Sequence, residues 1–485
     1  MTNVTRRSFI KWSLAGPAAA ALSPRLAPGA ADPPVDFGLQ PVGEVMPRSS
    51  LSISASPLSV GFEVLDRKRF DPVKTYPYLA SLGVKWARCQ TGWCRCETAR
   101  GQFDFAWLDA VVDALRKIGI QPWFNLGYGN KLYTPDSPDT FAVGWSPTFS
   151  DDARRAWLRF TQKIADHFRD RVRHWEIWNE PNIATFWKPK KPDAKDYVDL
   201  VKTTAPEIRE RVPDAVIIGG AFAGIPMDYI KACLEAGLAQ HVDKISYHPY
   251  RSVPEHKYEP QIDTLRKMIA QHNKRVAIWQ GENGCPSVGG GDSVGALSKL
   301  DWNESRQAKW LLRRIVTDLR FDIELTSYFH TADLVGYRGK TNYKGLLRGS
   351  DYTPKPAYRA YQCLCALFDA DTKPAALAPK LFDVQLPEEK RRYLRTAAFN
   401  RHGRALCAYW YPATLQSPWT PVRLSMKLPT PPDAAIADPV LIDPLTGRVY
   451  GLQPAHRSKA ALTFEKLPLL DYPLIVTDRR VPMGK

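Results

Sequence analysis

The stretch HWEIWNEPN, residues 174–182, decides the fold because it contains a buried strand, the end of that strand and an acid within nine positions. Bulky apolar residues are typical of a strand with both faces covered, and three stand here: Trp175, Ile177 and Trp178. Pro181 favours the first turn of a following helix. Glu180 therefore lies just beyond the end of a strand, and its position raises the question of a second acid elsewhere in the chain.

Short β-branched or aromatic runs recur along the chain, with longer amphipathic stretches between them. The runs are 59–64, 84–89, 121–126, 174–178, 215–219, 244–248, 275–279 and 324–329. Residues 104–118 and 152–168 have apolar positions spaced three and four apart, which predicts helices. Eight strands, each followed by a helix, predict a (β/α)8 (TIM) barrel over residues 57–369, with its active site at the carboxyl ends of the strands.

The alternation of strands and helices ends near Ala370. Eight further runs follow, separated by turn residues: 380–386, 392–400, 405–411, 422–428, 439–442, 448–452, 461–464 and 473–477. Many short strands without helices between them predict a C-terminal all-β sandwich over residues 370–485. Residues 32–56, before the barrel, predict a linker or an outer strand.

Residues 1–31 predict a twin-arginine signal peptide. Arg6 and Arg7 precede the sequence SFIK, a short apolar stretch and an alanine-rich segment that ends at Ala31. A disordered basic tail is the alternative interpretation. No later run reaches the ~20 apolar residues that a membrane helix needs, so we expect a periplasmic or secreted protein without a membrane span.

The chain of 485 residues has a formal charge of +17, and loss of the signal peptide removes four of these charges and leaves +13. A basic surface attracts anionic partners, among which an acidic polysaccharide is a candidate. No nucleic-acid-binding motif accompanies the charge, and export argues against that partner. The sequence does not indicate an oligomeric state.

The eight cysteines do not have the spacing of zinc sites, so we expect no metal and mostly buried apolar thiols. Disulfides are compatible with export, but the sequence does not reveal their pairing.

Glu282 is the second acid, just beyond the seventh run in VAIWQGENG, residues 276–284. In a closed barrel the fourth and seventh strands face each other across the mouth, so Glu180 and Glu282 can converge. Two carboxyls ~5 to 5.5 Å apart cleave a glycosidic bond with retention: one protonates the leaving oxygen and the other attacks the anomeric carbon. As simpler alternatives, Glu180 is an acid at a helix N-terminus and Glu282 a loop carboxylate.

Three segments resemble glycoside hydrolase family 39, a clan A family that includes β-xylosidases and α-L-iduronidases: FDFAWLDAVVDALRKIGIQPWFNLGY (103–128), HWEIWNEPNIATFW (174–187) and WQGENG (279–284). The likeness covers about residues 58–361. It implies a retaining O-glycosyl hydrolase that acts on a carbohydrate without a cofactor, with Glu180 as acid/base and Glu282 as nucleophile. The chain departs from the usual T-E-W or S-E-W context of the nucleophile, because Gly281 and Asn283 flank Glu282.

The resemblance also implies supporting residues. Arg88 matches an arginine that keeps the nucleophile ionised, and His248 and Tyr250 match a His-x-Tyr pair in which Tyr250 binds the nucleophile and His248 contacts sugar. A structural ion pair for Arg88 and a core position for His248 are the alternatives. Asn179, beside Glu180, is expected to hydrogen-bond a sugar hydroxyl. Further cleft candidates, each equally suited to packing, are Tyr128, Trp187, Trp279, Tyr328 and His330.

Two loops, 133–148 and 253–258, are expected to determine whether the mouth is a pocket or an open groove. A groove would favour an endo-acting clan A polysaccharide hydrolase. A protein that binds glycans without cleaving them, as part of exopolysaccharide assembly, is the alternative outside catalysis. The sequence does not indicate the sugar or the linkage.

Overall fold

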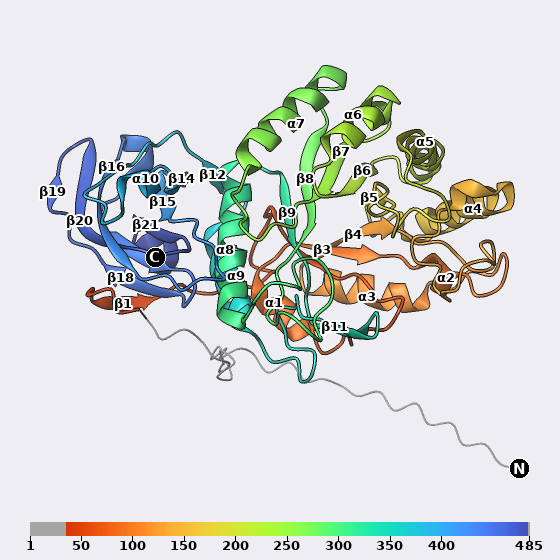
Figure 1. The fold of residues 1–485 in the computed structure, drawn as a ribbon, viewed down its shortest axis with the longest axis horizontal. Helices are drawn as coiled ribbons and strands as arrows, with labels where there is room; N and C mark the ends of the chain where they lie inside the picture. Colours follow the sequence, from red (N-terminus) through yellow and green to blue (C-terminus); the bar gives the residue numbers. More distant parts are fainter. Residues whose placement is uncertain (1–34, 484–485) are drawn as a thin grey trace, which may run out of the picture.

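The computed structural model describes residues 35–483 and contains a closed parallel barrel beside two antiparallel sheets (Figure 1). The signal peptide predicted at residues 1–31 lies outside the described residues. The barrel strands follow one another in chain order: β2 (Leu58–Gly61), β3 (Trp86–Gln90), β4 (Gln121–Leu126), β5 (His174–Ile177), β6 (Val216–Ala223), β7 (Lys244–His248), β8 (Ala277–Asn283) and β9 (Leu325–Tyr328). Parallel pairing of β2 with β9 closes the barrel. Each predicted run overlaps one of these strands, and the (β/α)8 prediction is confirmed.

Helices surround the barrel on its outside (Figure 1). The longer ones are α1 (Tyr76–Leu82), α3 (Ala106–Lys117), α4 (Asp151–Phe168), α5 (Ala194–Arg211), α6 (Met227–Glu235), α7 (Tyr258–His272), α8 (Glu304–Arg320) and α9 (Pro356–Leu367). In α4 the Ser150 side chain accepts a hydrogen bond from the Ala153 amide, and two acidic residues in the first turn complement the helix dipole. The remaining short helical segments are α2 (Trp93–Cys96), α10 (Glu388–Arg391), α11 (Arg480–Met483), η1 (Pro147–Phe149), η2 (Leu238–Gln240) and η3 (Pro432–Ala434).

Alternation along the strands determines what fills the barrel. On β5, Trp175 packs against Phe124 in the layer between strand and helix, whereas His174 and Glu176 point into the barrel interior. An aromatic and aliphatic layer fills the amino-terminal end of the barrel: Trp86, Trp123, His174, Ile218, Trp279 and Leu325. This layer supports the polar residues nearer the mouth.

Trp279 belongs to this lower layer, so the prediction that it lies in the cleft is wrong. It packs edge-on against Trp123 at a ring-centroid distance of 5.3 Å and stacks on His174. A strand rises ~3.3 Å per residue, so a side chain three residues before Glu282 lies well below the mouth.

Two antiparallel sheets confirm the predicted C-terminal β-sandwich. One sheet has the order β1 (Pro41–Glu44), β18 (Arg448–Gly451), β17 (Pro439–Asp443), β21 (Leu474–Asp478), β15 (Arg404–Trp410), β14 (Arg395–Arg401) and β12 (Thr372–Pro374). The other has the order β13 (Lys380–Phe382), β16 (Val422–Pro429), β20 (Ala461–Leu469) and β19 (His456–Arg457). Strand β1 precedes the barrel in sequence, yet it pairs with β18 (Figure 1).

A small hairpin that the sequence analysis did not predict follows the last barrel strand. It consists of β10 (Leu334–Tyr337) and β11 (Lys340–Asn342). All eight cysteine thiols are free, and all but Cys94 are buried. Among residues 35–483, no helix combines the length and the apolar character needed to cross a membrane.

A buried ion pair joins the barrel to the sandwich. Arg313 on α8 donates two hydrogen bonds to Glu255, at 2.8 and 2.7 Å, and Trp410 on β15 donates a third at 2.6 Å. Arg313 also donates to the carbonyl of Ala413, which follows β15. Because both ionic side chains are buried, each depends on the other for compensation of its charge.

Replacement of Arg313 by Met is expected to lower the free energy of unfolding by about 3 to 5 kcal/mol, because Glu255 stays buried without its counter-ion. Urea denaturation measures the change. Arg173→Met, which breaks the exposed Arg173–Asp214 pair, is the control and should cost less than about 1 kcal/mol. Equal effects of the two substitutions would contradict the importance of the buried pair.

Candidate active site

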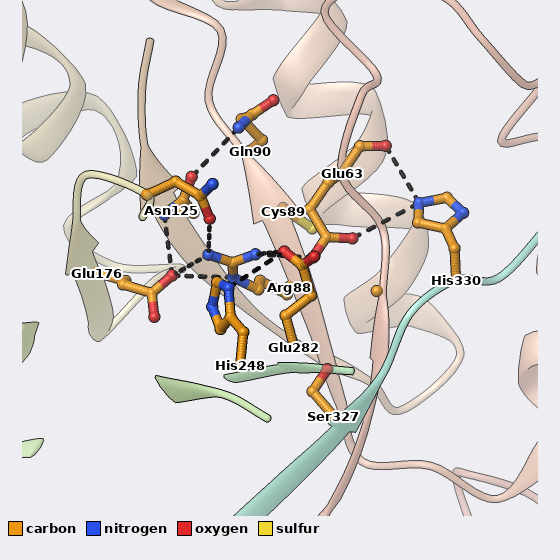
Figure 2. Close-up of polar contacts among 12 residues, drawn as sticks. Glu63, Arg88, Cys89, Gln90, Asn125, Glu176, His248, Glu282, Ser327 and His330 are labelled. Carbon is orange, nitrogen blue, oxygen red and sulfur yellow. Dashed lines mark hydrogen bonds and ion pairs between the residues drawn. The ribbon is translucent and has the colours of Figure 1, made fainter. Parts of the chain in front are cut away.

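A single guanidinium organises the polar interior of the barrel. Arg88 on β3 donates to Glu176 from Nε at 2.9 Å and from Nη2 at 2.5 Å, and to Glu282 from Nη1 at 2.6 Å. The same Nη1 donates to Glu63 at 3.1 Å, and Nη2 donates to Asn179 at 2.8 Å. Figure 2 shows Arg88 between Glu176 on one side and Glu63 and Glu282 on the other. One cation therefore holds three carboxyl groups from three different strand ends.

Arg88 lies on the aromatic layer below it. Its guanidinium carbon is 5.5 Å from the ring centroid of Trp123, a cation–π contact. Asn125, two residues further along β4, donates to Glu176 at 2.9 Å and to the carbonyl of Trp178 at 2.6 Å. The position of the guanidinium is thus fixed from below and from both sides.

The backbone beyond β5 places Glu180 at the mouth through two residues with positive φ. Trp178 has φ of 70° and Glu180 has φ of 49°, a region that non-glycine residues adopt at a cost in free energy. Tertiary hydrogen bonds hold both: the Trp178 amide donates to the carbonyl of Leu126 and the Glu180 amide to that of Ala221. The surrounding barrel therefore imposes the direction of the Glu180 side chain.

Glu282 lies at the mouth in a hydrogen-bonded and partly cationic environment. Its Oε2 accepts from Arg88, and its Oε1 accepts from the Tyr250 hydroxyl at 2.7 Å. His248 Nδ1 is 3.9 Å from Oε2. Donors to both oxygens thus hold this carboxyl group in place at the mouth.

Glu180 has different surroundings. Burial raises its pKa to about 7, even though Arg88 and Arg338 act in the opposite direction. Its Oε1 lies 3.0 Å from Nδ1 of His248, and burial lowers the pKa of that imidazole to about 4. At neutral pH the imidazole is uncharged, so Glu180 has no cationic hydrogen-bond partner and retains its proton to a higher pH than an exposed glutamate.

The two acids converge. One carboxyl oxygen of Glu180, one of Glu282 and one ring nitrogen of His248 all lie within 4.8 Å of one another. This geometry brings together Glu180, Glu282, His248, Tyr250 and Arg88 as the sequence predicts.

A cavity of about 570 Å³ is lined by four of these residues: Glu180, His248, Tyr250 and Glu282. Its other walls come from residues after β5, β6, β8 and β9, including Phe186, Phe329, Tyr337 and Lys344. The predicted loops 133–148 and 253–258 contribute no lining residue among those that the structure describes, so the expectation that they shape the mouth is wrong. Residues of segments 295–299 and 337–344 line the cavity instead.

The other predicted residues lie close to the site without lining this cavity. Asn179 is buried, and its amide nitrogen donates to the Tyr128 hydroxyl at 3.0 Å while its oxygen accepts from Arg88. Tyr128 stacks on Phe186, which does line the cavity. Asn179 and Tyr128 thus form a layer directly behind the wall.

Three of the remaining candidates are fully buried. Trp187 packs between Trp178 and Tyr197, and the Tyr328 hydroxyl donates to the carbonyl of Cys285 at 3.3 Å. His330 Nε2 lies 3.2 Å from the carbonyl of Glu63. These contacts are packing and hydrogen bonding within the barrel, the alternative that the sequence left open.

Glu180, His248 and Glu282 also have the composition of a metal site, since each offers one ligand atom. Glu282, however, already accepts hydrogen bonds at both oxygens, and one of its donors is the cationic Arg88 at 2.6 Å. A second cation at the same carboxylate would be repelled. The donor set therefore fits proton transfer better than metal binding.

Glu63 and Glu176 were missed by the sequence analysis. Glu176 lies inside the run 174–178, where alternation directs it into the barrel, and an acid inside an apolar run was the available signal. Glu63 follows β2 and had no motif around it. Burial raises the pKa of Glu63 to about 8 against the influence of Arg88, so this carboxyl group is mostly protonated at neutral pH.

Comparisons with known proteins show which family this chain resembles. The sequence profile described as Glycosyl hydrolases family 39 matches residues 80–277, and the profile of the twin-arginine translocation signal matches residues 3–23. A β-xylosidase of Geobacillus stearothermophilus is 28% identical over 166 residues, which are 32% of this chain and 32% of the relative. A β-xylosidase of Caldicellulosiruptor saccharolyticus is 23% identical over 300 residues, 54% of this chain and 56% of the relative. The chain therefore spans between about a third and somewhat over half of these relatives.

A solved family 39 glycoside hydrolase from Bacteroides cellulosilyticus WH2 has the same fold, with a TM-score of 0.65 at 22% identity over 87% of this chain and 81% of that chain. The barrel and the profile match over residues 80–277 together make this chain similar to the clan A glycoside hydrolases. Within that clan, its similarity is to family 39. The profile match at residues 3–23 supports the predicted twin-arginine signal.

The pKa of Glu63 generates a prediction for stability. Because the folded-state pKa of about 8 exceeds the ordinary value of 4.5, the folded protein binds a proton that the unfolded chain has released between these pH values. This contribution to stability is complete below about pH 4.5 and is lost as the pH rises to about 8. Glu63→Gln removes the titration.

The unfolding free energy of the wild type minus that of Glu63→Gln should therefore fall between pH 5 and pH 8, by at most about 1.4 kcal/mol per pH unit. Urea denaturation of both proteins at several pH values gives the difference. A difference independent of pH would show that Glu63 does not hold the proton.

Proposed function

We propose that the protein is a retaining O-glycoside hydrolase in which Glu180 is the acid/base and Glu282 the nucleophile. The observation that carries the proposal is the convergence of two carboxyl groups within 4.8 Å in unlike surroundings. Retaining enzymes place their acids ~5 to 5.5 Å apart, whereas direct attack by water needs ~6.5 to 9.5 Å. The short separation leaves no room for water between acid and sugar and favours direct attack by a carboxylate.

In the first step, the Glu180 proton passes to the glycosidic oxygen as the bond from that oxygen to the anomeric carbon breaks. A Glu282 oxygen attacks the anomeric carbon from the opposite face and forms a glycosyl ester. Arg88 and Tyr250 donate hydrogen bonds to the two oxygens of Glu282 and orient it for the attack. The raised pKa of Glu180 keeps its proton available near neutral pH.

In the second step, Glu180, now ionised, removes a proton from water as the water oxygen attacks the anomeric carbon. The ester bond to Glu282 breaks and the proton again resides on Glu180. His248, at 3.0 Å from Glu180, orients that carboxyl group in both steps. The sugar leaves with the anomeric configuration it had in the substrate.

The extent of the cavity supports action on a terminal sugar or a short chain, because segments 295–299 and 337–344 stand beside the two acids. An endo-acting clan A hydrolase is the rival within the same chemistry. A glycan-binding protein of exopolysaccharide assembly is the rival outside it, but binding alone does not require a buried acid with a pKa of about 7 that converges with a second acid. The twin-arginine signal supports action in the periplasm or outside the cell.

Glu282→Gln is expected to lower kcat on 4-nitrophenyl glycosides by more than about 10⁴-fold, because the nucleophile is lost. NMR of the first product released by the wild type should show the anomeric configuration of the substrate. Glu259→Gln, at an exposed position on α7, is the control and should retain wild-type kcat. An inverted first product would refute the assignment of Glu282.

Glu180→Ala is expected to hydrolyse glycosides with poor leaving groups about 10²- to 10⁴-fold more slowly, since protonation of the leaving oxygen is lost. Dinitrophenyl glycosides need little protonation, so formation of their glycosyl ester should be spared. Azide should restore turnover by attacking that ester, with release of a glycosyl azide. Absence of azide rescue would contradict the role of Glu180.

The pKa of Glu180 sets the expected pH dependence. Protonated Glu180 is needed for the first step, cleavage of the glycosidic bond. For substrates with poor leaving groups, kcat/KM should therefore fall above about pH 7, tenfold per pH unit. In Glu180→Ala this alkaline decline should disappear. A decline that persists at the same pH in the variant would assign it to another group.

A further inference from the structure

Lys344 is a buried cation in the wall of the cavity. It follows β11 by two residues, lines the cavity beside Tyr250 and is only 2% exposed. Its Nζ lies 3.4 Å from Oδ1 of Asn342 and 5.6 Å from the ring centroid of Tyr250. Among residues 35–483, its Nζ has a hydrogen bond to Asn342 but no ion pair, and the charge of Glu282 acts on it only from a distance. A buried charge without a counter-ion is costly, which points to a missing partner.

Two more cations line the same cavity. Arg338 stands at the tip of the β10–β11 hairpin and Lys299 on the segment after β8, and both are exposed at the rim. The guanidinium of Arg338 lies 5.9 Å from the ring centroid of Phe186, which also lines the cavity. Three cationic side chains thus face a cavity whose lining contains two acids, Glu180 and Glu282.

The charge balance of the cavity is positive near neutral pH. Burial lowers the pKa of Lys344 to about 8, so its amine is still protonated at pH 7, and the raised pKa of Glu180 removes part of the negative charge. Against these three cationic side chains, the lining carries only the two acids Glu180 and Glu282 among the residues that the structure describes. The field inside the cavity therefore favours an anion.

We propose that the cavity binds an anionic sugar residue, bearing a carboxylate or a sulfate ester, whose negative group pairs with Lys344 and, at the rim, with Arg338. The inference rests on the function proposed above and specifies its substrate class. A sugar without a charged group would leave Lys344 buried and uncompensated after it had displaced the water from the cavity.

The competing explanation is that Lys344 stabilises the charge of Glu282, which acts on it through space. The two explanations differ in what removal of the charge does. Loss of support for the nucleophile would slow all substrates equally. Loss of an ion pair to the substrate would slow anionic substrates alone.

The experiment compares Lys344→Met with the wild type on matched 4-nitrophenyl glycosides, both anomers: glucuronide with glucoside, galacturonide with galactoside, and each 6-O-sulfated glycoside with its parent. In at least one pair the wild type should have the higher kcat/KM for the anionic member. In the variant that preference should fall by about ten- to a hundredfold, the loss of one charge-assisted hydrogen bond. Preference for the uronides or for the sulfates identifies the anion.

Lys340→Met is the matched control, because Lys340 lies on the same hairpin and its Nζ reaches only the carbonyl of Gly291 outside the cavity. The preference of Lys340→Met for the anionic over the neutral glycoside of each pair, as a ratio of kcat/KM values, should equal that of the wild type. Met is close to Lys in length and suits a buried position, and thermal denaturation checks that Lys344→Met is folded. Equal slowing of both members of every pair, or a wild type that prefers the neutral member throughout, would overturn the inference.

Failure of the proposed function is distinguishable from failure of this inference. If the wild type hydrolyses none of the glycosides, calorimetric titration with the same compounds still measures binding. Tighter binding of an anionic member, lost in Lys344→Met, would support the inference without catalysis. Equal binding of charged and neutral members would overturn it.

Discussion

The site depends on one buried guanidinium. Arg88 binds Glu176, Glu63 and Glu282, which approach from three strands, and it lies on Trp123 in the aromatic layer below. Burial of so many carboxyl groups is costly unless a cation and hydrogen bonds compensate it. The carboxyl ends of the barrel strands can carry acids at this density because Arg88 is there, and its fixed fork geometry sets where each acid points.

Two acids at the mouth differ because their neighbours differ. Glu282 faces donors on both oxygens, whereas Glu180 faces the uncharged imidazole of His248 and the apolar rings around Trp178. Desolvation without a close cation raises a carboxyl pKa, and a close cation lowers it. Burial thus raises the pKa of Glu180, the acid that has no cationic hydrogen-bond partner.

Much of this arrangement is readable from sequence. The repeat of strand and helix predicted the barrel, and the positions of Glu180 and Glu282 past two strand ends predicted their convergence. Trp279 was misplaced although its position three residues before Glu282 already puts it below the mouth; what the sequence did not show was the irregular register of β8 against β9. Glu63 escaped notice because nothing local marks a carboxyl group whose partner, Arg88, comes from another strand. The hairpin carrying Arg338 was likewise invisible, since its role arises only where it folds over the mouth.

Strand β1 gives the chain an order of events during synthesis. Its partner, β18, is made about four hundred residues later, so the ribosome releases the first strand of the sandwich long before the edge it completes exists. The barrel, built entirely from residues between the two, can close in the meantime. A chain interrupted before residue 448 would leave β1 without the strand that it pairs with in the complete sandwich.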